Sequence, residues 1–198
     1  VGWGLSRLDG RAASEAGNVR SAEAAWRYLV DDLRIPPQQI VLFGRSLGSG
    51  ATLDLASRAV VKGSSGSPAE VAGVLLESPM ESLLRLRGST PGALLSFFFY
   101  RVDAVRNYEK IGGIRVPVAI IHGTADEKVP CAHGKTLHAL APWAFEPYWV
   151  EGQGHRIPLR MRVAYIQKFS KWLEEGRPPL DKRSEGTNVP VQPVEPKK

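Results

Sequence analysis

One serine in the sequence stands in a pattern suited to attack on an acyl carbonyl. Ser46 is the centre of Gly44-Arg-Ser-Leu-Gly48, which follows an apolar run and opens a stretch with helical spacing. A tight turn from a strand into a helix holds its central residue in a strained backbone region, and flanking glycines remove the Cβ atoms that would collide there. The pattern therefore predicts an exposed nucleophilic hydroxyl, with the Leu47 amide at the helix start as donor to an oxyanion.

A serine hydroxyl needs a base at neutral pH, and the base needs an orienting carboxylate. His155 lies in a glycine-rich turn, Gly152-Gln-Gly-His155, directly after an apolar run that ends at Val150. A loop histidine placed there can reach over the edge of a sheet toward Ser46, so we predict that His155 is the base. The other three histidines fall at the end of a predicted strand or inside a predicted helix, where structural roles are expected: His122, His133 and His138.

Two acidic residues are candidates for the orienting carboxylate. Asp126 comes shortly after the apolar run 116–121, and Glu77 ends the run 71–76. Both carboxylates are expected at the same edge of the sheet. We prefer Asp126, because its strand is the last one before the strand that leads to His155, and Glu77 stays the alternative.

Three other side chains near these residues in the sequence have less defined roles. Glu127 is expected to be a solvated loop charge. For Arg45, two interpretations stay open: contact with an acidic leaving group, or a structural salt bridge. Cys131 is the single cysteine, so it cannot form an intramolecular disulfide, and an ordinary side chain is expected, which is compatible with a reducing compartment. These residues imply neither a metal ion nor an organic cofactor.

The elements that must position these groups alternate along the chain. Apolar runs at 39–43, 71–76, 116–121 and 146–150 are too short for helices and predict buried strands. Helical spacing predicts helices over about 22–33, with Asn18 or Ser21 as N-cap, over 49–61 and over 132–140. A last helix carries one apolar face, made of Met161, Tyr165, Phe169, Trp172 and Leu173. This alternation predicts an α/β fold with a mostly parallel sheet and helices on both faces.

Length and composition indicate one globular domain. The chain has 198 residues, of which 43% are hydrophobic and 23% charged, and no window is long and apolar enough for a membrane helix. The net charge is +6, but the basic residues are scattered, so no nucleic-acid partner is expected. We predict a domain over 1–176 and a disordered tail over 177–198, where prolines mix with charges. The run Phe97 to Tyr100 is expected to be core or a lid, with peripheral membrane contact as the alternative.

Four blocks in this order resemble the alpha/beta-hydrolase superfamily over nearly all of 1–175: residues 43–58, 72–79, 121–130 and 149–155. Within it, the sequence is similar to the hydrolase-domain branch that includes depalmitoylating thioesterases and the relatives of the Bem-type polarity hydrolase. The resemblance implies Ser46 as nucleophile, Asp126 as acid and His155 as base. It also implies hydrolysis of esters or thioesters, acyl chains on membrane-bound proteins among the substrates, and a cytoplasmic location that includes the cytosolic face of membranes.

The same resemblance implies that strands are missing at the N-terminus. The first residues resemble the end of the fourth strand of such a domain, so we expect a partial alpha/beta-hydrolase fold without the loop that carries the second oxyanion donor. Strand 39–43 would then have an unpaired edge. A non-catalytic remnant that acts as a binding module is the second hypothesis. A serine peptidase or small-ester esterase is the rival among enzymes, since fold and triad do not fix the substrate.

Overall fold

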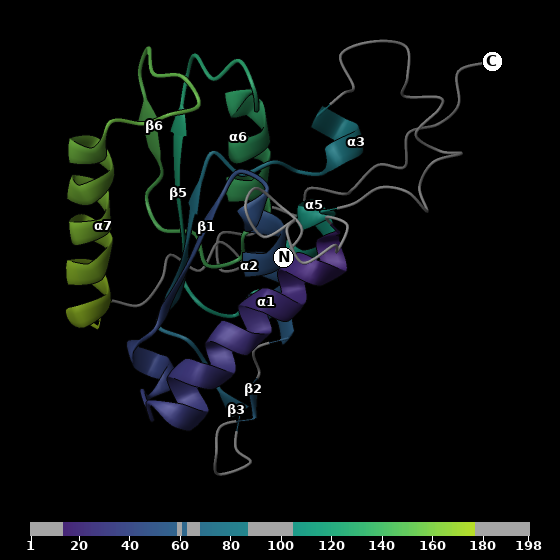
Figure 1. Ribbon diagram of the computed structural model, residues 1–198. Helices are drawn as coiled ribbons and strands as arrows, with labels where there is room; N and C mark the ends of the chain where they lie inside the picture. The colour runs from purple at the N-terminus through teal and green to yellow at the C-terminus, as the bar shows by residue number, and fades with distance from the viewer. Residues whose placement is uncertain (1–13, 59–60, 63–67, 87–104, 177–198) are drawn as a thin grey trace.

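Four parallel strands form the sheet that organises the molecule (Figure 1). The computed structural model describes residues 14–58, 61–62, 68–86 and 105–176. The strand order is β1-β4-β5-β6, with bounds Val41–Arg45, Gly73–Glu77, Val118–Gly123 and Tyr148–Val150. Two short strands, β2 (Val61–Lys62) and β3 (Pro68–Ala69), pair separately and antiparallel. The predicted tail 177–198 and the aromatic run at 97–100 lie outside the described residues.

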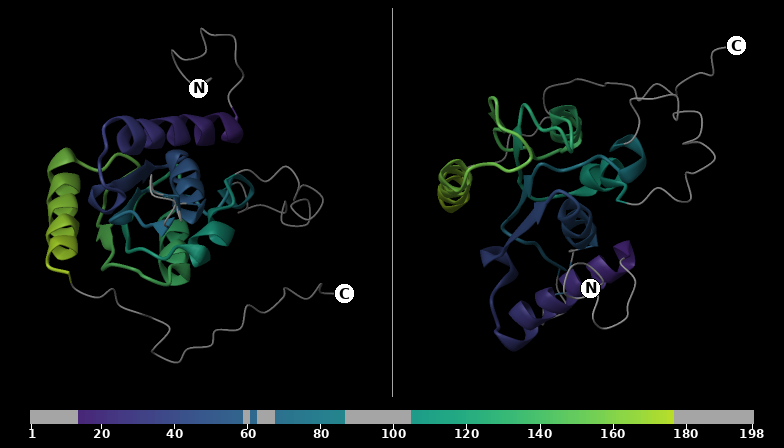
Figure 2. Two further views of the ribbon diagram at one scale, coloured as in Figure 1. Left: turned by 90° about the horizontal axis from the view of Figure 1, so that it is seen from below. Right: turned by 45° about the horizontal axis from the view of Figure 1, so that its top comes forward.

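Helices cover both faces of this sheet. They are α1 (Glu15–Arg27), which runs on into a π-helical turn (Tyr28–Asp32), α2 (Gly48–Arg58), α3 (Leu83–Leu86), α5 (Asn107–Lys110), α6 (Cys131–Leu140) and α7 (Leu159–Glu174). Single 3-10 turns lie at Pro37–Gln39 and Ile111–Gly113. Figure 2 shows α7 on one side of the sheet and α2 and α6 on the other. The predicted α/β class is confirmed.

The alternation of side chains along the central strands explains why helices are needed on both sides. Val74 and Leu76 of β4 face the cluster that includes Leu53 of α2, whereas Leu75 between them faces the cluster that includes Phe169 of α7. All residues of β4 and β5 are buried. Successive residues of a strand point to opposite faces, so an uninterrupted apolar run requires two apolar layers.

Two predictions about the N-terminal part were wrong in detail. The first helix begins earlier than predicted, because the Ser14 hydroxyl accepts the Gly17 amide at 3.0 Å and acts as N-cap in place of Asn18 or Ser21. The strand predicted at 39–43 lies at Val41–Arg45 and is not buried as a whole. Phe43 is 47% exposed, and β1 is an edge strand within the described part of the chain.

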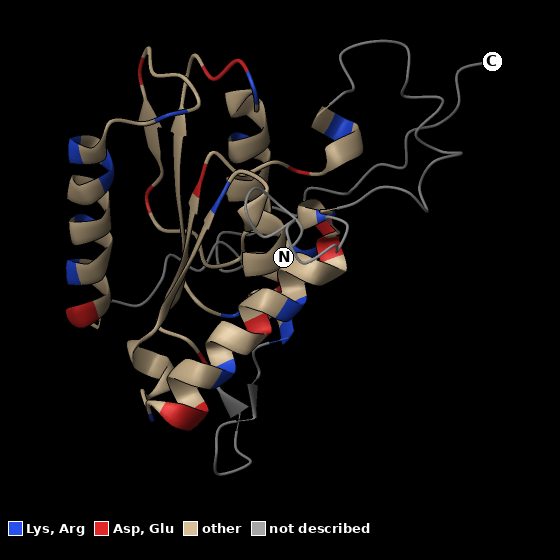
Figure 3. Cartoon of the chain, viewed as in Figure 1, with Lys and Arg blue, Asp and Glu red and all other residues tan. Residues whose placement is uncertain are grey.

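Charge is distributed over the described elements without separation by sign. Figure 3 shows Lys and Arg interspersed with Asp and Glu along the helices and the loops. Several opposite charges pair across elements, as Arg58 of α2 does with Glu23 of α1 at 2.9 Å. None of the described helices is both long and apolar enough to cross a membrane.

The packing of α7 can be tested by removing its central aromatic ring. Phe169 is 1% exposed and lies 5.1 Å from the ring of Phe145, centroid to centroid. We expect Phe169→Ala to lower the free energy of unfolding by about 3–5 kcal/mol, because it removes buried apolar surface and leaves a cavity. Urea unfolding followed by circular dichroism measures this. Gln167→Ala, at an exposed position of the same helix, is the control, and an equal effect of both changes would contradict this packing.

Candidate active site

The predicted nucleophile lies in a strained turn at the carboxyl edge of the sheet. β1 ends at Arg45, α2 begins at Gly48, and Ser46 between them has a positive φ of 50°. The Ser46 amide donates to the carbonyl of Glu77 on the neighbouring strand at 2.9 Å. A non-glycine residue with this φ is disfavoured by roughly 1–3 kcal/mol and persists only where its surroundings fix it. The strand-to-helix turn that the sequence predicts is therefore present at Ser46.

The two glycines of the motif differ in what they permit. A Cβ atom on Gly44 would lie 2.9 Å from the backbone of Ser49 and closer still to the Thr52 side chain, so Gly44 lets α2 approach β1. A Cβ atom on Gly48 would meet none of the described atoms within 4 Å. The expectation that both glycines prevent a collision is thus correct for Gly44 and wrong for Gly48.

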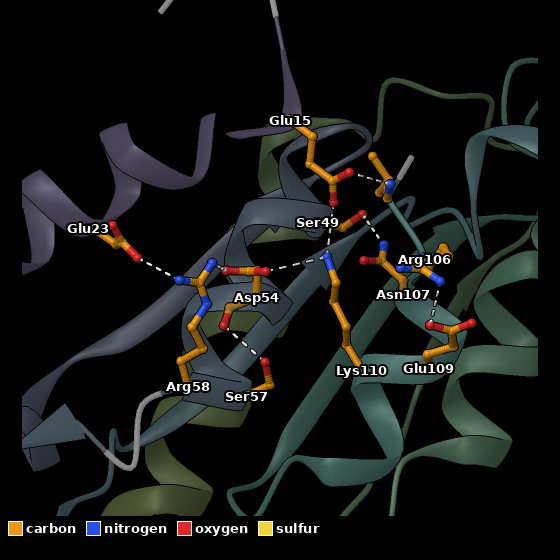
Figure 4. A network of polar contacts seen from close by, with 11 residues as sticks. Glu15, Glu23, Ser49, Asp54, Ser57, Arg58, Arg106, Asn107, Glu109 and Lys110 are labelled. Carbon is orange, nitrogen blue, oxygen red and sulfur yellow. Dashed lines mark hydrogen bonds and ion pairs between the residues drawn. The ribbon is translucent and has the colours of Figure 1, made fainter. Parts of the chain in front are cut away.

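A buried chain of polar contacts reaches the turn at Ser46, and Figure 4 shows its link between Asn107 and Ser49. The Ser49 hydroxyl donates to the carbonyl of Ser46 at 2.6 Å, and the side-chain amide of Asn107 donates to Ser49 Oγ at 2.9 Å and to the carbonyl of Met80 at 2.8 Å. Asn107 is fully buried. No local motif distinguishes this asparagine, because its partners are far away in the sequence, and sequence reasoning did not single it out.

Ion pairs fix the short helix that carries Asn107. Lys110 of α5 lies 3.0 Å from Glu15 of α1 and 3.6 Å from Asp54 of α2, as Figure 4 also shows. The second carboxylate oxygen of Glu15 accepts the amide of Val105 at 3.1 Å. Three helices are thereby joined beside the turn at Ser46.

His155 and Asp126 are in direct contact. The Nδ1 atom of His155 lies 2.8 Å from Oδ2 of Asp126, whose side chain is fully buried. The other oxygen of Asp126 accepts the amides of Lys128 and Val129, each at 2.9 Å. Burial alone would raise the pKa of Asp126, but the Val129 amide, the His155 ring and the Lys128 amide outweigh it, so the pKa lies below its ordinary value. An ionised carboxylate fixes the ring orientation and leaves Nε2 as the proton acceptor.

The loop that carries His155 folds back over the sheet edge. β6, which precedes it, is separated from β1 by two strands, a distance of roughly 14 Å at the usual strand spacing. The loop nevertheless comes within reach of the residue beside Ser46, because a terminal nitrogen of Arg45 donates to the His155 carbonyl at 3.3 Å. The loop can pass this close to β5 because residue 123 is a glycine. A Cβ atom on Gly123 would collide with the carbonyls of Gln153 and Gly154.

The other three histidines occupy structural positions, as expected. His122 is fully buried, its Nε2 donates to the carbonyl of Val129 at 2.8 Å, and burial lowers the pKa of its ring, which keeps it neutral. It also lies 3.4 Å from Asp126. His133 and His138 lie in α6, the first beside Glu81 at 3.3 Å and the second at 3.1 Å from the Phe145 carbonyl.

Glu77, the alternative acid, has different partners. Its fully buried carboxylate lies between Nε of Arg45 at 3.2 Å and Nε of Arg162 at 3.1 Å. Burial raises the pKa of Glu77 above its ordinary value even though both arginines oppose this. The structural salt bridge is therefore the correct interpretation of Arg45. Glu127 is exposed, as expected for a loop charge.

A hollow opens to solvent beside His155. It has a volume of about 390 Å³ and is lined by Ala125, Glu127, Lys128, Gly152, Gly154, His155 and Arg156. Within the described ranges, His, Cys, Asp and Glu side chains nowhere gather in threes as they would around a metal ion.

Solved structures with the same architecture are alpha/beta hydrolases. The alpha-beta hydrolase from Vibrio vulnificus superposes with a TM-score of 0.61 at 22% identity, covering 81% of this chain and 57% of that chain. A meta-cleavage product hydrolase from Pseudomonas fluorescens gives 0.60 at 18% identity, covering 89% and 78%. The chain has the alpha/beta-hydrolase fold, and the resemblance stated from its sequence is confirmed.

Curated relatives narrow the likeness to one group within the superfamily. The chain is 34% identical over 165 residues to the alpha/beta hydrolase domain-containing protein 17C of Xenopus tropicalis, covering 83% of this chain and 48% of that protein. The human protein of the same name is 33% identical over 165 residues, covering 83% and 45%. The chain thus spans about half the length of the curated relatives it matches. No family model matches it.

The low pKa of Asp126 predicts a specific dependence of stability on pH. A carboxyl whose pKa is lower in the folded protein adds stability above its unfolded pKa of about 3.9, and this is lost as pH falls through the folded value. We expect Asp126→Asn to cost about 1–3 kcal/mol at pH 5 and progressively less toward pH 2. Urea unfolding at a series of pH values measures the difference.

Glu127→Gln is the matched control for this series. Glu127 is the exposed neighbour of Asp126, so its replacement should change the unfolding free energy little at any pH. A cost of Asp126→Asn that stays constant down to pH 2 would contradict the lowered pKa.

Proposed function

We propose that the protein is a serine hydrolase that cleaves carboxylic esters or thioesters with Ser46, His155 and Asp126. The observation that supports this most is the 2.8 Å contact between the His155 ring and the buried Asp126 carboxylate. It lies on the sheet edge where Ser46 stands in a strained turn. A base oriented by a carboxylate, at the same sheet edge as a serine that follows a strand and precedes a helix, is the arrangement expected of a hydroxyl activated for acyl transfer.

In the first half of the reaction, Ser46 Oγ attacks the acyl carbonyl and His155 Nε2 takes its proton. Asp126 holds the ring in the tautomer that leaves Nε2 unprotonated and then stabilises the imidazolium. The Leu47 amide, at the start of α2, donates to the oxyanion of the tetrahedral intermediate. The intermediate collapses when the alcohol or thiol leaves with the proton from His155, and the acyl group remains on Ser46.

In the second half, water replaces the leaving group. His155 removes a proton from a water molecule, which attacks the acyl-serine ester. The second tetrahedral intermediate uses the same oxyanion donor. Its collapse expels Ser46 Oγ, which regains a proton from His155, and the carboxylic acid is released.

For the substrate we propose acyl thioesters, including palmitoyl groups on cysteine side chains of proteins at the cytosolic face of membranes. The support is the likeness to the depalmitoylating branch of the superfamily. A thiolate is also a better leaving group than an amine. Cleavage of a thioester therefore needs less proton donation from His155 and less stabilisation of the oxyanion than cleavage of an amide. A serine peptidase would need stronger assistance to the leaving nitrogen from the same residues.

A fluorophosphonate probe tests the nucleophile. We expect covalent labelling of the wild-type chain at Ser46, identified by mass spectrometry, and none of Ser46→Ala. Asp126→Asn should label roughly 10⁴-fold more slowly, because the ring then lacks the carboxylate that selects its tautomer. Ser57→Ala is the control, since Ser57 lies on an exposed part of α2, and it should label like the wild type. Folded wild-type protein that does not react would favour a non-catalytic binding module.

The substrate class is tested by comparing leaving groups on one acyl chain. We expect kcat/KM for a palmitoyl-cysteine peptide to exceed that for the matching palmitoyl-amide peptide by at least about 10³-fold. Release of free thiol and of palmitate measures the two rates. Equal rates would support the peptidase alternative, and hydrolysis of short p-nitrophenyl esters alone would support a small-ester esterase.

A further inference from the structure

A buried carboxylate lies between two arginines next to the proposed triad. Glu77 ends β4 and pairs in register with Arg45, the last residue of β1. Arg162 approaches the same carboxylate from α7, on one face of the sheet. Glu77 is fully buried, while the side chains of Arg45 and Arg162 are 37% and 29% exposed. Two cations around one buried anion are more than charge balance requires, and each arginine has further N–H donors beyond the Nε atom that faces Glu77.

Each arginine also contacts the loop that carries the proposed base. Arg45 uses Nε for Glu77, and its Nη2 donates to the carbonyl of His155 at 3.3 Å. Arg162 uses Nε for Glu77, and its Nη2 donates to the carbonyl of Ile157 at 3.4 Å. Ile157 is 2% exposed and belongs to the apolar cluster between the sheet and α7. The two guanidinium groups therefore hold both ends of residues 155–157.

The backbone of Glu77 contacts the other half of the site. Its carbonyl accepts the amide of Ser46 at 2.9 Å, the bond that closes the nucleophile turn onto β4. One residue thus contacts the serine turn through its main chain and the histidine loop through two side-chain partners. These contacts come from β1, β4 and α7, which are far apart in the sequence.

We propose that Glu77, acting through Arg45 and Arg162, is a positioning residue that fixes the His155 loop relative to the turn at Ser46. This inference rests on the proposed function. Guanidinium groups suit the task, because each presents several N–H donors in a rigid plane and can bind a carboxylate and a carbonyl at once. A reacting group displaced by about 1 Å can cost on the order of 10²-fold in rate, so fixing the loop has a direct effect on turnover.

The first test replaces one arginine without removing its charge. Lysine at 45 keeps a cation near Glu77, but its single ammonium cannot contact both the carboxylate and the His155 carbonyl. We expect Arg45→Lys to lower kcat for a small thioester by about 10- to 100-fold, with KM changed less than about 3-fold. Arg58→Lys is the control, because Arg58 forms exposed ion pairs on α1 and α2, and its kcat should match the wild type.

The second test removes the central charge and reads the histidine ring directly. We expect Glu77→Gln to broaden the proton NMR signal of the His155 Nδ1–H group, because the loop is then fixed less firmly and the contact of the ring with Asp126 loosens. Glu146→Gln, at an exposed carboxylate paired with Lys168, should leave this signal unchanged.

A double variant shows whether Glu77 acts through the arginine. If it does, Arg45→Lys and Glu77→Gln together should lower kcat by less than the product of their separate effects. The proposal would be overturned if the two effects on kcat multiply, or if both single variants keep the wild-type kcat and the wild-type NMR signal of the His155 ring. If Glu77→Gln fails to fold, the kcat of Arg45→Lys relative to Arg58→Lys decides whether the proposal holds. If the wild type hydrolyses no ester and Ser46 is not labelled, the proposed function fails, whereas the NMR signal of the His155 ring still tests how this loop is positioned.

Discussion

The ionised state of Asp126 depends on hydrogen bonds that replace the water it has lost. Its side chain is fully buried, yet its pKa lies below the ordinary value. The reason is the turn that follows: the amides of Lys128 and Val129 both point at one carboxylate oxygen, and the ring of His155 takes the other. A carboxylate that accepts several fixed donors keeps its charge even when burial opposes it. The orientation of His155, and with it the chemistry proposed for Ser46, depends on this one charged group.

Glu77 shows what happens to a carboxylate at the same edge without such donors. Its partners are two arginine side chains, both at ion-pair distance, and neither carboxylate oxygen has a hydrogen bond of good geometry among the described residues. Burial therefore prevails and raises its pKa. The sequence offers both Asp126 and Glu77 as candidates for the acid, with Asp126 preferred, since each lies at or just after the end of a buried apolar run. What separates them is the backbone of the following turn, which offers amides to Asp126 and not to Glu77.

Local sequence patterns were sufficient to predict those parts of the candidate site that are formed by residues close together in the chain. The glycine-flanked Ser46, the apolar runs that end at the sheet edge and the glycine-rich turn before His155 are each visible within a few residues. The buried polar contacts of Asn107 and the two arginines around Glu77 join elements far apart in the chain, and single-sequence patterns do not contain such pairings. The apolar run before Ser46 likewise indicates a strand but not whether another element covers it, and β1 has the expected unpaired edge among the described residues.

Two of the four non-glycine residues with a positive φ in the described part of the chain lie where strands end. Arg45 and Glu77 are paired in register, and the residue after each, Ser46 and Ser78, has a positive φ of 50° and 47°. Each strained residue is fixed by its own amide, which donates to the next strand: Ser46 to Glu77, and Ser78 to Ile121, both at 2.9 Å. Strain of this size persists only where the surroundings over-determine the backbone. The buried parallel strands supply that constraint, and so the same packing that stabilises the fold also sets the direction in which the chain leaves the sheet at Ser46.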